Sequence, residues 1–182
     1  MDWFTADTHF GHRNIIRHCG RPFTDELDMD QQLLDNINAT VSPSDTLYHL
    51  GDFARYHRAI AAYRSRIRCR NVILVLGNHD PQTRSGQPKE RFLGMFSRVY
   101  VRLRMRVPVG DTKRTLVLSH NAMRTWDNSH RGSWNLFGHS HGQLPDMPRT
   151  LDVGVDAHGF RPISLPEVAS IIESQEAKLC GD

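Results

Sequence analysis

The stretch VILVLGNHDP, residues 72–81, guides the interpretation of the whole sequence. Its five apolar residues run directly into Gly77, Asn78, His79 and Asp80. A short apolar run bounded by turn residues is typical of a buried strand. The strand's carboxyl end therefore carries side chains that can bind metal ions or transfer protons. Other expected strands along the chain end in the same kind of residue.

Length and composition indicate a single domain, residues 1–182. Hydrophobic residues make up 38% and charged residues 24% of the chain, as in ordinary soluble proteins. No apolar run approaches the roughly 20 residues that span a bilayer, and we expect no secretory signal at the start of the sequence. The three scattered cysteines indicate reduced thiols and a cytoplasmic protein. The net charge of +3 permits an anionic substrate without requiring nucleic acid.

Apolar runs that alternate with helical patterns predict an α/β protein. Strands are expected at 3–7, 46–52, 71–78, 98–109, 114–120, 133–139 and 150–156. Helices are expected at 25–41, 55–67, 87–96 and 165–177, the first with apolar spacing at Leu27, Leu33, Leu34 and Ile37.

The expected strand at 98–109 alternates strictly between apolar and basic residues. Val101 is among the residues of its apolar face, and Arg102, Arg104 and Arg106 lie on the other face. An arginine row is compatible with nucleic-acid binding. We interpret it as the solvated face of an edge strand, where charges prevent edge-to-edge pairing.

Five of the expected strands end in residues that can bind metal ions. These residues are Asp7, His9, Asp52, Asn78, His120, His139 and His141. The carboxyl ends of strands in an open α/β sheet line the ligand crevice, where a rigid scaffold fixes side chains. One such residue usually has only a hydrogen-bonding role. Agreement among five strand ends favours a shared site.

The chemistry of this set favours divalent metal ions. Oxygen and imidazole ligands without cysteine suit manganese, iron, cobalt, nickel or zinc. Seven candidates exceed the three protein ligands of a typical catalytic zinc site and suit two metals that share a carboxylate. A mononuclear zinc hydrolase is the alternative. Two aspartates offset only part of the charge of two such ions, which leaves charge to bind phosphate and acidify a bridging water.

The short sequence blocks that contain these residues resemble the motifs of the calcineurin-like metallophosphoesterase superfamily. DTH at 7–9, GD at 51–52, GNHD at 77–80, SH at 119–120 and GHSH at 138–141 stand in the family's order. The longer stretches around the first and last blocks look like a small bacterial and phage branch of predicted phosphoesterases. The resemblance implies a four-layer α-β-β-α sandwich with two mixed sheets. It also implies a hydrolase that acts on phosphate esters with two divalent metal ions.

The resemblance assigns roles residue by residue. It implies one metal held by Asp7, His9, Asp52 and His141, and a second held by Asp52, Asn78, His120 and His139. Catalytic roles fall on Asp52 as the bridge, on His79 beside the substrate and on Asp80, which would hold His79. A hydroxide shared by the metals would attack phosphorus, while His79 stabilises or protonates the leaving group. Manganese is the first choice of metal, with iron, zinc, nickel or cobalt as alternatives.

Residues beside these blocks are candidates for substrate contact. His12 and Arg13 fit this role and a surface pair at a helix start equally well. The loop 121–134 contributes Arg124, Trp126, His130 and Arg131, which could bind phosphate or stack on a base. No role is predicted for His18, His49, His57 and His158.

The expected substrates follow from the size of the chain. A small chain without an evident cap domain favours phosphodiesters, including nucleotides or nucleic-acid ends, over phosphomonoesters. A phosphomonoesterase with the same site is the first alternative. A non-catalytic metal-dependent interaction module is the second, and the complete set of ligand positions argues against it.

Overall fold

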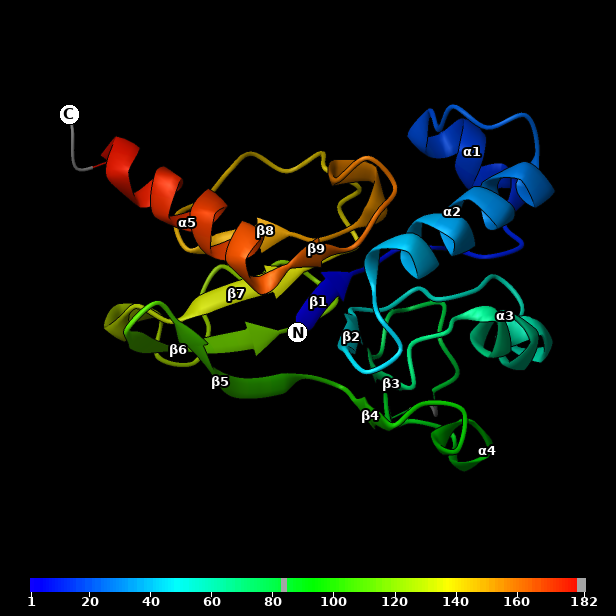
Figure 1. Cartoon of the computed structure of the whole chain (residues 1–182), viewed down its shortest axis with the longest axis horizontal. Helices are drawn as coiled ribbons and strands as arrows, with labels where there is room; N and C mark the ends of the chain where they lie inside the picture. The colour runs from blue at the N-terminus through cyan, green and yellow to red at the C-terminus, as the bar shows by residue number, and fades with distance from the viewer. Residues whose placement is uncertain (83–84, 180–182) are drawn as a thin grey trace.

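The computed structural model describes residues 1–82 and 85–179 (Figure 1). The strands are β1 (Asp2–Thr5), β2 (Thr46–His49), β3 (Asn71–Val75), β4 (Arg98–Tyr100), β5 (Leu103–Val109), β6 (Thr112–Leu118), β7 (Trp134–Phe137), β8 (Thr150–Asp152) and β9 (Ile163–Ser164). The α-helices are α1 (Arg13–Cys19), α2 (Glu26–Thr40), α3 (Ile60–Arg66), α4 (Glu90–Leu93) and α5 (Leu165–Leu179).

The strands form two mixed sheets. The first has the order β4-β3-β2-β1-β9, with β1 to β4 parallel and β9 antiparallel. The second has the order β5-β6-β7-β8, with β5 antiparallel to β6 and the other pairs parallel. This arrangement confirms the expected α/β class with two mixed sheets. It also directs the carboxyl ends of several parallel strands toward a common region.

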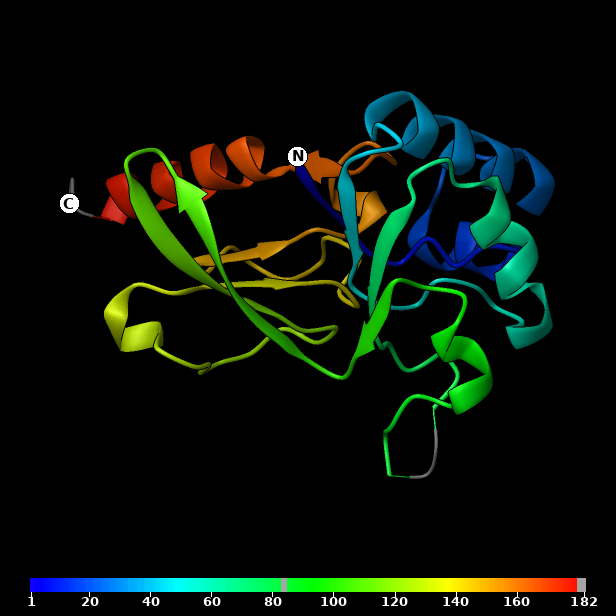
Figure 2. The same ribbon diagram turned by 60° about the horizontal axis from the view of Figure 1, so that its bottom comes forward.

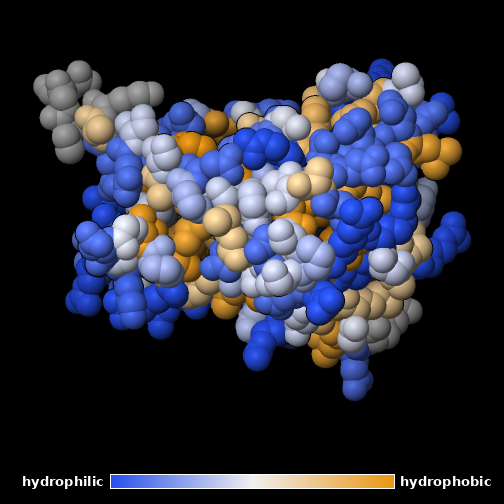
Figure 3. Space-filling model, viewed as in Figure 1, coloured by the Kyte–Doolittle hydropathy of each residue, from blue (hydrophilic) through white to orange (hydrophobic). Residues whose placement is uncertain are grey.

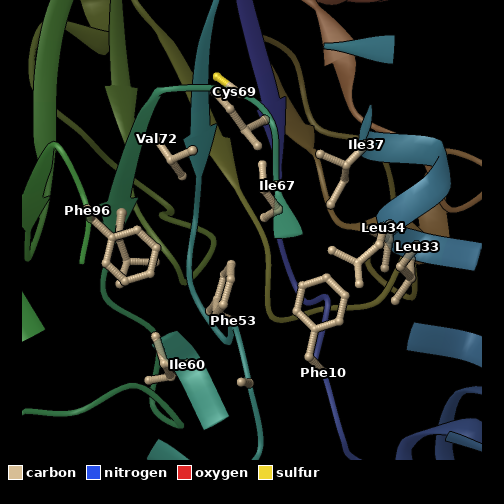
Figure 4. Packing of buried hydrophobic residues seen from close by; sticks show 14 of the residues in the cluster. Phe10, Leu33, Leu34, Ile37, Phe53, Ile60, Ile67, Cys69, Val72 and Phe96 are labelled. Atoms are coloured by element: carbon tan, nitrogen blue, oxygen red, sulfur yellow. The ribbon is translucent and has the colours of Figure 1, made fainter. Parts of the chain in front are cut away.

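A hydrophobic cluster joins helices α1 to α4 to one face of the first sheet. The Asp25 carboxylate caps α2 by accepting hydrogen bonds from the next turn's amides, and the helix then presents Leu34 to the cluster. Phe10 and Phe53, which follow β1 and β2, lie at the centre, with Leu34 on one side and Phe96 on the other (Figure 4). The segments that follow β1 and β2 are thus fixed in place by aromatic rings packed in this cluster.

A second hydrophobic cluster fills the space between the two sheets. Along β3, Val72 and Leu74 pack with the first cluster, whereas Ile73 and Val75 pack with the second. Burial on both faces explains why this strand is a continuous apolar run. The second sheet adds residues such as the buried Trp134.

Helix α5 covers this second cluster. It contacts β1 and β9 of the first sheet and β5 and β8 of the second (Figure 2). On the face presented in Figure 3, hydrophobic side chains form small areas between polar ones. In the described part of the chain, no helix combines the length and the apolar character needed to cross a membrane.

Several sequence predictions of secondary structure were wrong in detail. The expected strand at 98–109 is two strands, since the chain bends at Val101 and Arg102 and passes from the first sheet to the second. Val101 is consequently 48% exposed. The prediction that the arginines lie on an edge strand is confirmed for β5. Helix α1 and strand β9 were not predicted, and Leu27, expected on the apolar face of α2, is 73% exposed.

Two leucines of α2 provide a test of this packing. Leu34→Ala is expected to lower the free energy of unfolding by about 2–5 kcal/mol, because it empties part of a closed core. Leu27→Ala is the matched control on the same helix, and we expect a change within about 0.5 kcal/mol. Urea denaturation of both variants measures the difference. Equal losses would contradict the described packing.

Candidate functional site

The strand ends meet through backbone hydrogen bonds. The Asp7 amide donates to the Gly51 carbonyl at 3.0 Å, and the His9 amide donates to the Asp52 carbonyl at 2.9 Å. Across the gap between the sheets, the His139 amide donates to the Asp7 carboxylate at 2.8 Å. The first, second and last blocks of the sequence pattern are therefore held against one another.

Five of the predicted ligand residues adopt left-handed backbone conformations. Their φ angles are 58° at Asp7, 49° at His9, 57° at Asp52, 67° at His139 and 49° at His141. Residues other than glycine rarely adopt this conformation, and each instance costs about 1–3 kcal/mol. Such strain clusters at functional sites, where the surrounding structure imposes it. Its concentration here marks the convergence point as a functional site.

Two glycines allow the close approach of these blocks. A Cβ atom at Gly51 would lie 2.5 Å from Nδ1 of His120. A Cβ atom at Gly138 would lie 2.6 Å from Oδ2 of Asp7. Both distances are shorter than van der Waals contact, so a larger residue would displace the side chains of the site.

The Asp52 carboxylate lies at the centre of the site. Its Oδ2 is 3.5 Å from Nε2 of His9 and 3.5 Å from Nε2 of His120. Oδ1 accepts a hydrogen bond from the His79 amide at 2.9 Å, which fixes the carboxylate between the two histidines. The Asn78 side-chain oxygen lies 3.1 Å from Nε2 of His120.

Donor atoms fall into groups compact enough to hold a metal ion. Atoms within 4.8 Å of one another come from Asp7, His9 and His141 in one group and from Asp52, His120 and His139 in another. A further group joins Asp52 with His9 and His79. The structure thus brings all seven predicted ligands together, and it places His79 within the same constellation.

Unpaired buried atoms at the site suit a divalent cation. Oδ1 of Asp7 and both ring nitrogens of His9 are buried and have no hydrogen-bond partner in the described structure. Such groups are costly to bury unless something compensates them. A divalent cation would compensate a carboxylate and an imidazole together.

Hydrogen bonds also prepare two histidines as ligands. Nδ1 of His120 lies 2.8 Å from the Leu50 carbonyl, and Nδ1 of His141 lies 2.7 Å from Oδ2 of Asp156. Because these oxygens accept, Nδ1 carries the proton in each ring, and Nε2 of a neutral ring keeps a lone pair. This is the usual arrangement for a metal-binding histidine.

The charges at the site favour a cation. Burial raises the pKa of Asp7 to about 7 and lowers the pKa of His9 to about 2. Burial also opposes the charge of His120, but the Asp52 and Asp7 carboxylates outweigh it and raise the pKa of His120 to about 9. The carboxylates that favour an imidazolium here would equally favour a metal cation.

Asp80 acts on the backbone of the turn that carries His79. Its Oδ2 accepts hydrogen bonds from the amides of Gly77 and Asp52 at 2.8 Å, and Oδ1 accepts from the Phe53 amide at 3.0 Å. Asp80 therefore fastens the turn that carries His79 to the end of β2, rather than holding the imidazole itself. It is a positioning residue that lies beneath the site.

The predicted substrate residues divide into two sets. The His12 ring lies 5.3 Å from His9 and 5.9 Å from His79, and the three line a common hollow of about 460 Å³. Arg13 instead lies at the surface, 3.8 Å from Glu26 at the start of α2. Its position fits the alternative interpretation, a surface pair.

The loop after β6 reaches the hollow beside Asn78 and His120 through Asn121 and Met123, but not through its predicted substrate residues. Trp126 donates a hydrogen bond to the Ser133 carbonyl at 3.1 Å, which ties the loop to itself. Arg124 lines a separate, mainly apolar hollow, and His130 and Arg131 are exposed. Within the described residues, none of these four side chains lines the hollows that contain the predicted ligands.

Sequence reasoning missed the buried ion pair that supports His141. The Arg21 guanidinium donates to both carboxylate oxygens of Asp156 at 2.8 Å and to the Asp7 carbonyl at 2.7 Å. Asp156 in turn accepts from His141. Asp156 ends the apolar run 150–156, so the strand-end criterion could have found it. Arg21 has no comparable signal in the sequence.

His49 was also given no role, yet it is fully buried beneath the site. The Thr8 hydroxyl donates to the Phe53 carbonyl, so Nε2 of His49, 2.9 Å away, donates to that hydroxyl. The contact links the end of β2 to the first block of the pattern.

The chain belongs to the calcineurin-like phosphoesterase family, whose model matches residues 3–145. Members of this family generally use divalent metal ions, and the assignment supports a metal-dependent phosphoesterase. The match spans all five blocks that meet at the site. It confirms the family resemblance drawn from the sequence.

Two further comparisons extend the likeness over nearly the whole chain. An uncharacterized protein from Methanocaldococcus jannaschii is 27% identical over 180 residues, which cover 94% of this chain and 90% of that protein. The crystal structure of a protein of unknown function from Aquifex aeolicus superimposes with a TM-score of 0.69 at 23% identity, covering 94% of this chain and 99% of that one. The structural likeness confirms the fold.

His49 provides a pH-dependent test of the site's foundation. Burial lowers the pKa of His49 to about 3, whereas an exposed histidine of the unfolded chain has a pKa of about 6.5. At a pH between these two pKa values, His49 binds a proton in the unfolded chain but not in the folded protein. The free energy of unfolding should therefore fall with decreasing pH, by up to about 1.4 kcal/mol per pH unit from this group. His49→Gln keeps a donor for Thr8 and should show a shallower fall.

Denaturation at several pH values between 7 and 5 gives the slope of the unfolding free energy against pH for the native protein and for His49→Gln. A chelator is present, so that metal release does not contribute to either slope. Identical slopes for the two proteins would contradict a neutral, buried His49.

Proposed function

We propose that this protein is a binuclear metal-dependent phosphodiesterase. The observation that carries the proposal is the Asp52 carboxylate, which has Oδ2 at 3.5 Å from histidines on either side. Asp7, His9, Asp52 and His141 would hold one ion, and Asp52, Asn78, His120 and His139 would hold the other. The unpaired buried atoms of Asp7 and His9 support the same arrangement.

Bound divalent ions supply Lewis acidity, which lowers the pKa of water and neutralises phosphate charge. The chain's own residues do the remaining work. His79 is half-buried, with its ring 5.2 Å from that of His9, and in this position it can donate a proton to a leaving oxygen. His12 stays neutral because burial lowers its pKa to about 4, so it can accept or donate a hydrogen bond beside the substrate.

The openness of the site favours diesters over monoesters. Asn78 and His139 are exposed. The predicted ligands border two hollows, one of about 460 Å³ beside His12 and one of about 650 Å³ beside Asn78 and His120. A phosphodiester carries a substituent on each side of phosphorus, and the two hollows offer room for both. Manganese is the first metal to test because of the oxygen and imidazole donors.

Hydrolysis assays on manganese-loaded protein test this proposal. We expect faster turnover of bis-p-nitrophenyl phosphate than of p-nitrophenyl phosphate. Asp52→Asn should lower both the metal content and the turnover, the latter by more than about 100-fold, because even residues that only orient a ligand cost about 10–100-fold. Metal content is measured by elemental analysis of the same samples.

His79→Gln is the matched control variant. It should keep both metals while slowing turnover, most strongly for poor leaving groups. Loss of metal in this variant would reassign His79 as a ligand. Full metal content and turnover in Asp52→Asn would overturn the proposal. Faster monoester hydrolysis would instead indicate a phosphomonoesterase, and bound metal without any turnover would indicate an interaction module.

A further inference from the structure

A row of arginines leads away from the candidate site along β5. We propose that this arginine track, defined as Arg102, Arg104 and Arg106, binds the phosphate backbone of a single-stranded nucleic acid whose scissile phosphodiester lies at the site. The inference rests on the proposed phosphodiesterase function and names its substrate class.

The track is continuous with the site. The hollow of about 650 Å³ that is bordered by Asn78 and His120 also includes Arg102 in its lining. A second hollow of about 420 Å³ lies two residues further along the chain and is lined by Arg104 and Arg106. Strand β5 starts beside the carboxyl end of β4 and runs away from the first sheet (Figure 2). A single-stranded nucleic acid that leaves the site through the first hollow would therefore pass Arg102 and reach the second hollow, beside Arg104 and Arg106.

The pleat of β5 directs the track to solvent. Leu103, Met105 and Val107 pack toward the cluster between the sheets, and Arg104 and Arg106, which alternate with them, are exposed. The edge position alone would explain exposed charge on this strand. It would not explain why Arg102, the first arginine of the track, lines the same hollow as the predicted ligands Asn78 and His120.

The positive charge of the track is largely uncompensated. Arg104 and Arg106 have no carboxylate within 4.0 Å among residues 1–82 and 85–179. Arg102 lies 3.8 Å from Asp127, but both side chains are more than 40% exposed, and such pairs contribute little. No acidic residue of the described chain lines either hollow. An anionic ligand would therefore meet mainly positive charge along this path, with the exposed Asp127 beside Arg102 as a carboxylate near it.

The spacing of the track suits a repeating phosphate chain. Alternate residues of a strand are about 7 Å apart, which is comparable to the separation of successive phosphates in an extended nucleotide chain. Each guanidinium can bind a phosphate through two parallel hydrogen bonds. A nucleic-acid strand presents one phosphodiester to the site and further phosphates to the track. A small diester would not reach Arg106.

Binding of an oligonucleotide tests the track. The probe is fluorescein-labelled dT20 with phosphorothioate linkages, which resist hydrolysis, and its anisotropy is followed with manganese-loaded protein at several salt concentrations. For Arg104→Gln/Arg106→Gln we expect binding to weaken about tenfold at low salt. The slope of log affinity against log salt should fall by about 1.4, since each lost contact to a single strand removes about 0.7.

Arg68→Gln/Arg70→Gln is the matched control. These arginines are also exposed but precede β3, at the end of the first sheet opposite the site. This variant should bind dT20 as the native protein does, and both double variants should hydrolyse bis-p-nitrophenyl phosphate at the native rate.

The outcomes separate the two proposals. The proposed role of the track would be contradicted if Arg104→Gln/Arg106→Gln bound dT20 as tightly as the native protein. It would also be contradicted if the control variant lost as much affinity. Either result would hold even if the small diester is hydrolysed. Arginine-dependent binding of dT20 by a protein that hydrolyses no ester would support the track and contradict the phosphodiesterase.

Discussion

The site depends on a carboxylate placed where two sheets meet. Asp52 follows β2 of the first sheet. Its oxygen lies between His9, which follows β1 of the same sheet, and His120, which follows β6 of the second. Burying a carboxylate between two histidines is unfavourable unless a positive charge compensates the carboxylate. The surrounding structure accepts this cost, together with left-handed backbone at five of the seven predicted ligands. The fold therefore holds an arrangement that calls for a cation.

Residues that never face the substrate maintain this arrangement. Asp80 binds three amides and joins the turn after β3 to the end of β2. Arg21 crosses beneath the site from the end of α1 and orients Asp156, which orients His141. Asp80 and Arg21 are buried. Their hydrogen bonds over-determine the strained turns, which is the condition for strain to persist at a functional site.

Features that depend on neighbouring residues could be predicted from the sequence, whereas features that depend on contacts between distant residues could not. The buried strand at 72–76 and its polar end could be identified because a continuous apolar run has a local signature. The break between β4 and β5 could not, since the alternating pattern continues through Val101 and Arg102 while the chain changes sheets. Arg21 was invisible for a similar reason: its partner lies 135 residues away in the sequence.

The most direct test of the account is anomalous X-ray scattering from crystals soaked in manganese. We predict two anomalous peaks about 3.5–4 Å apart, the usual separation in two-metal sites, with the Asp52 carboxylate between them. The peak on one side should lie beside Asp7, His9 and His141, and the other beside Asn78, His120 and His139. A single peak, or two peaks that do not share Asp52, would contradict the central claim.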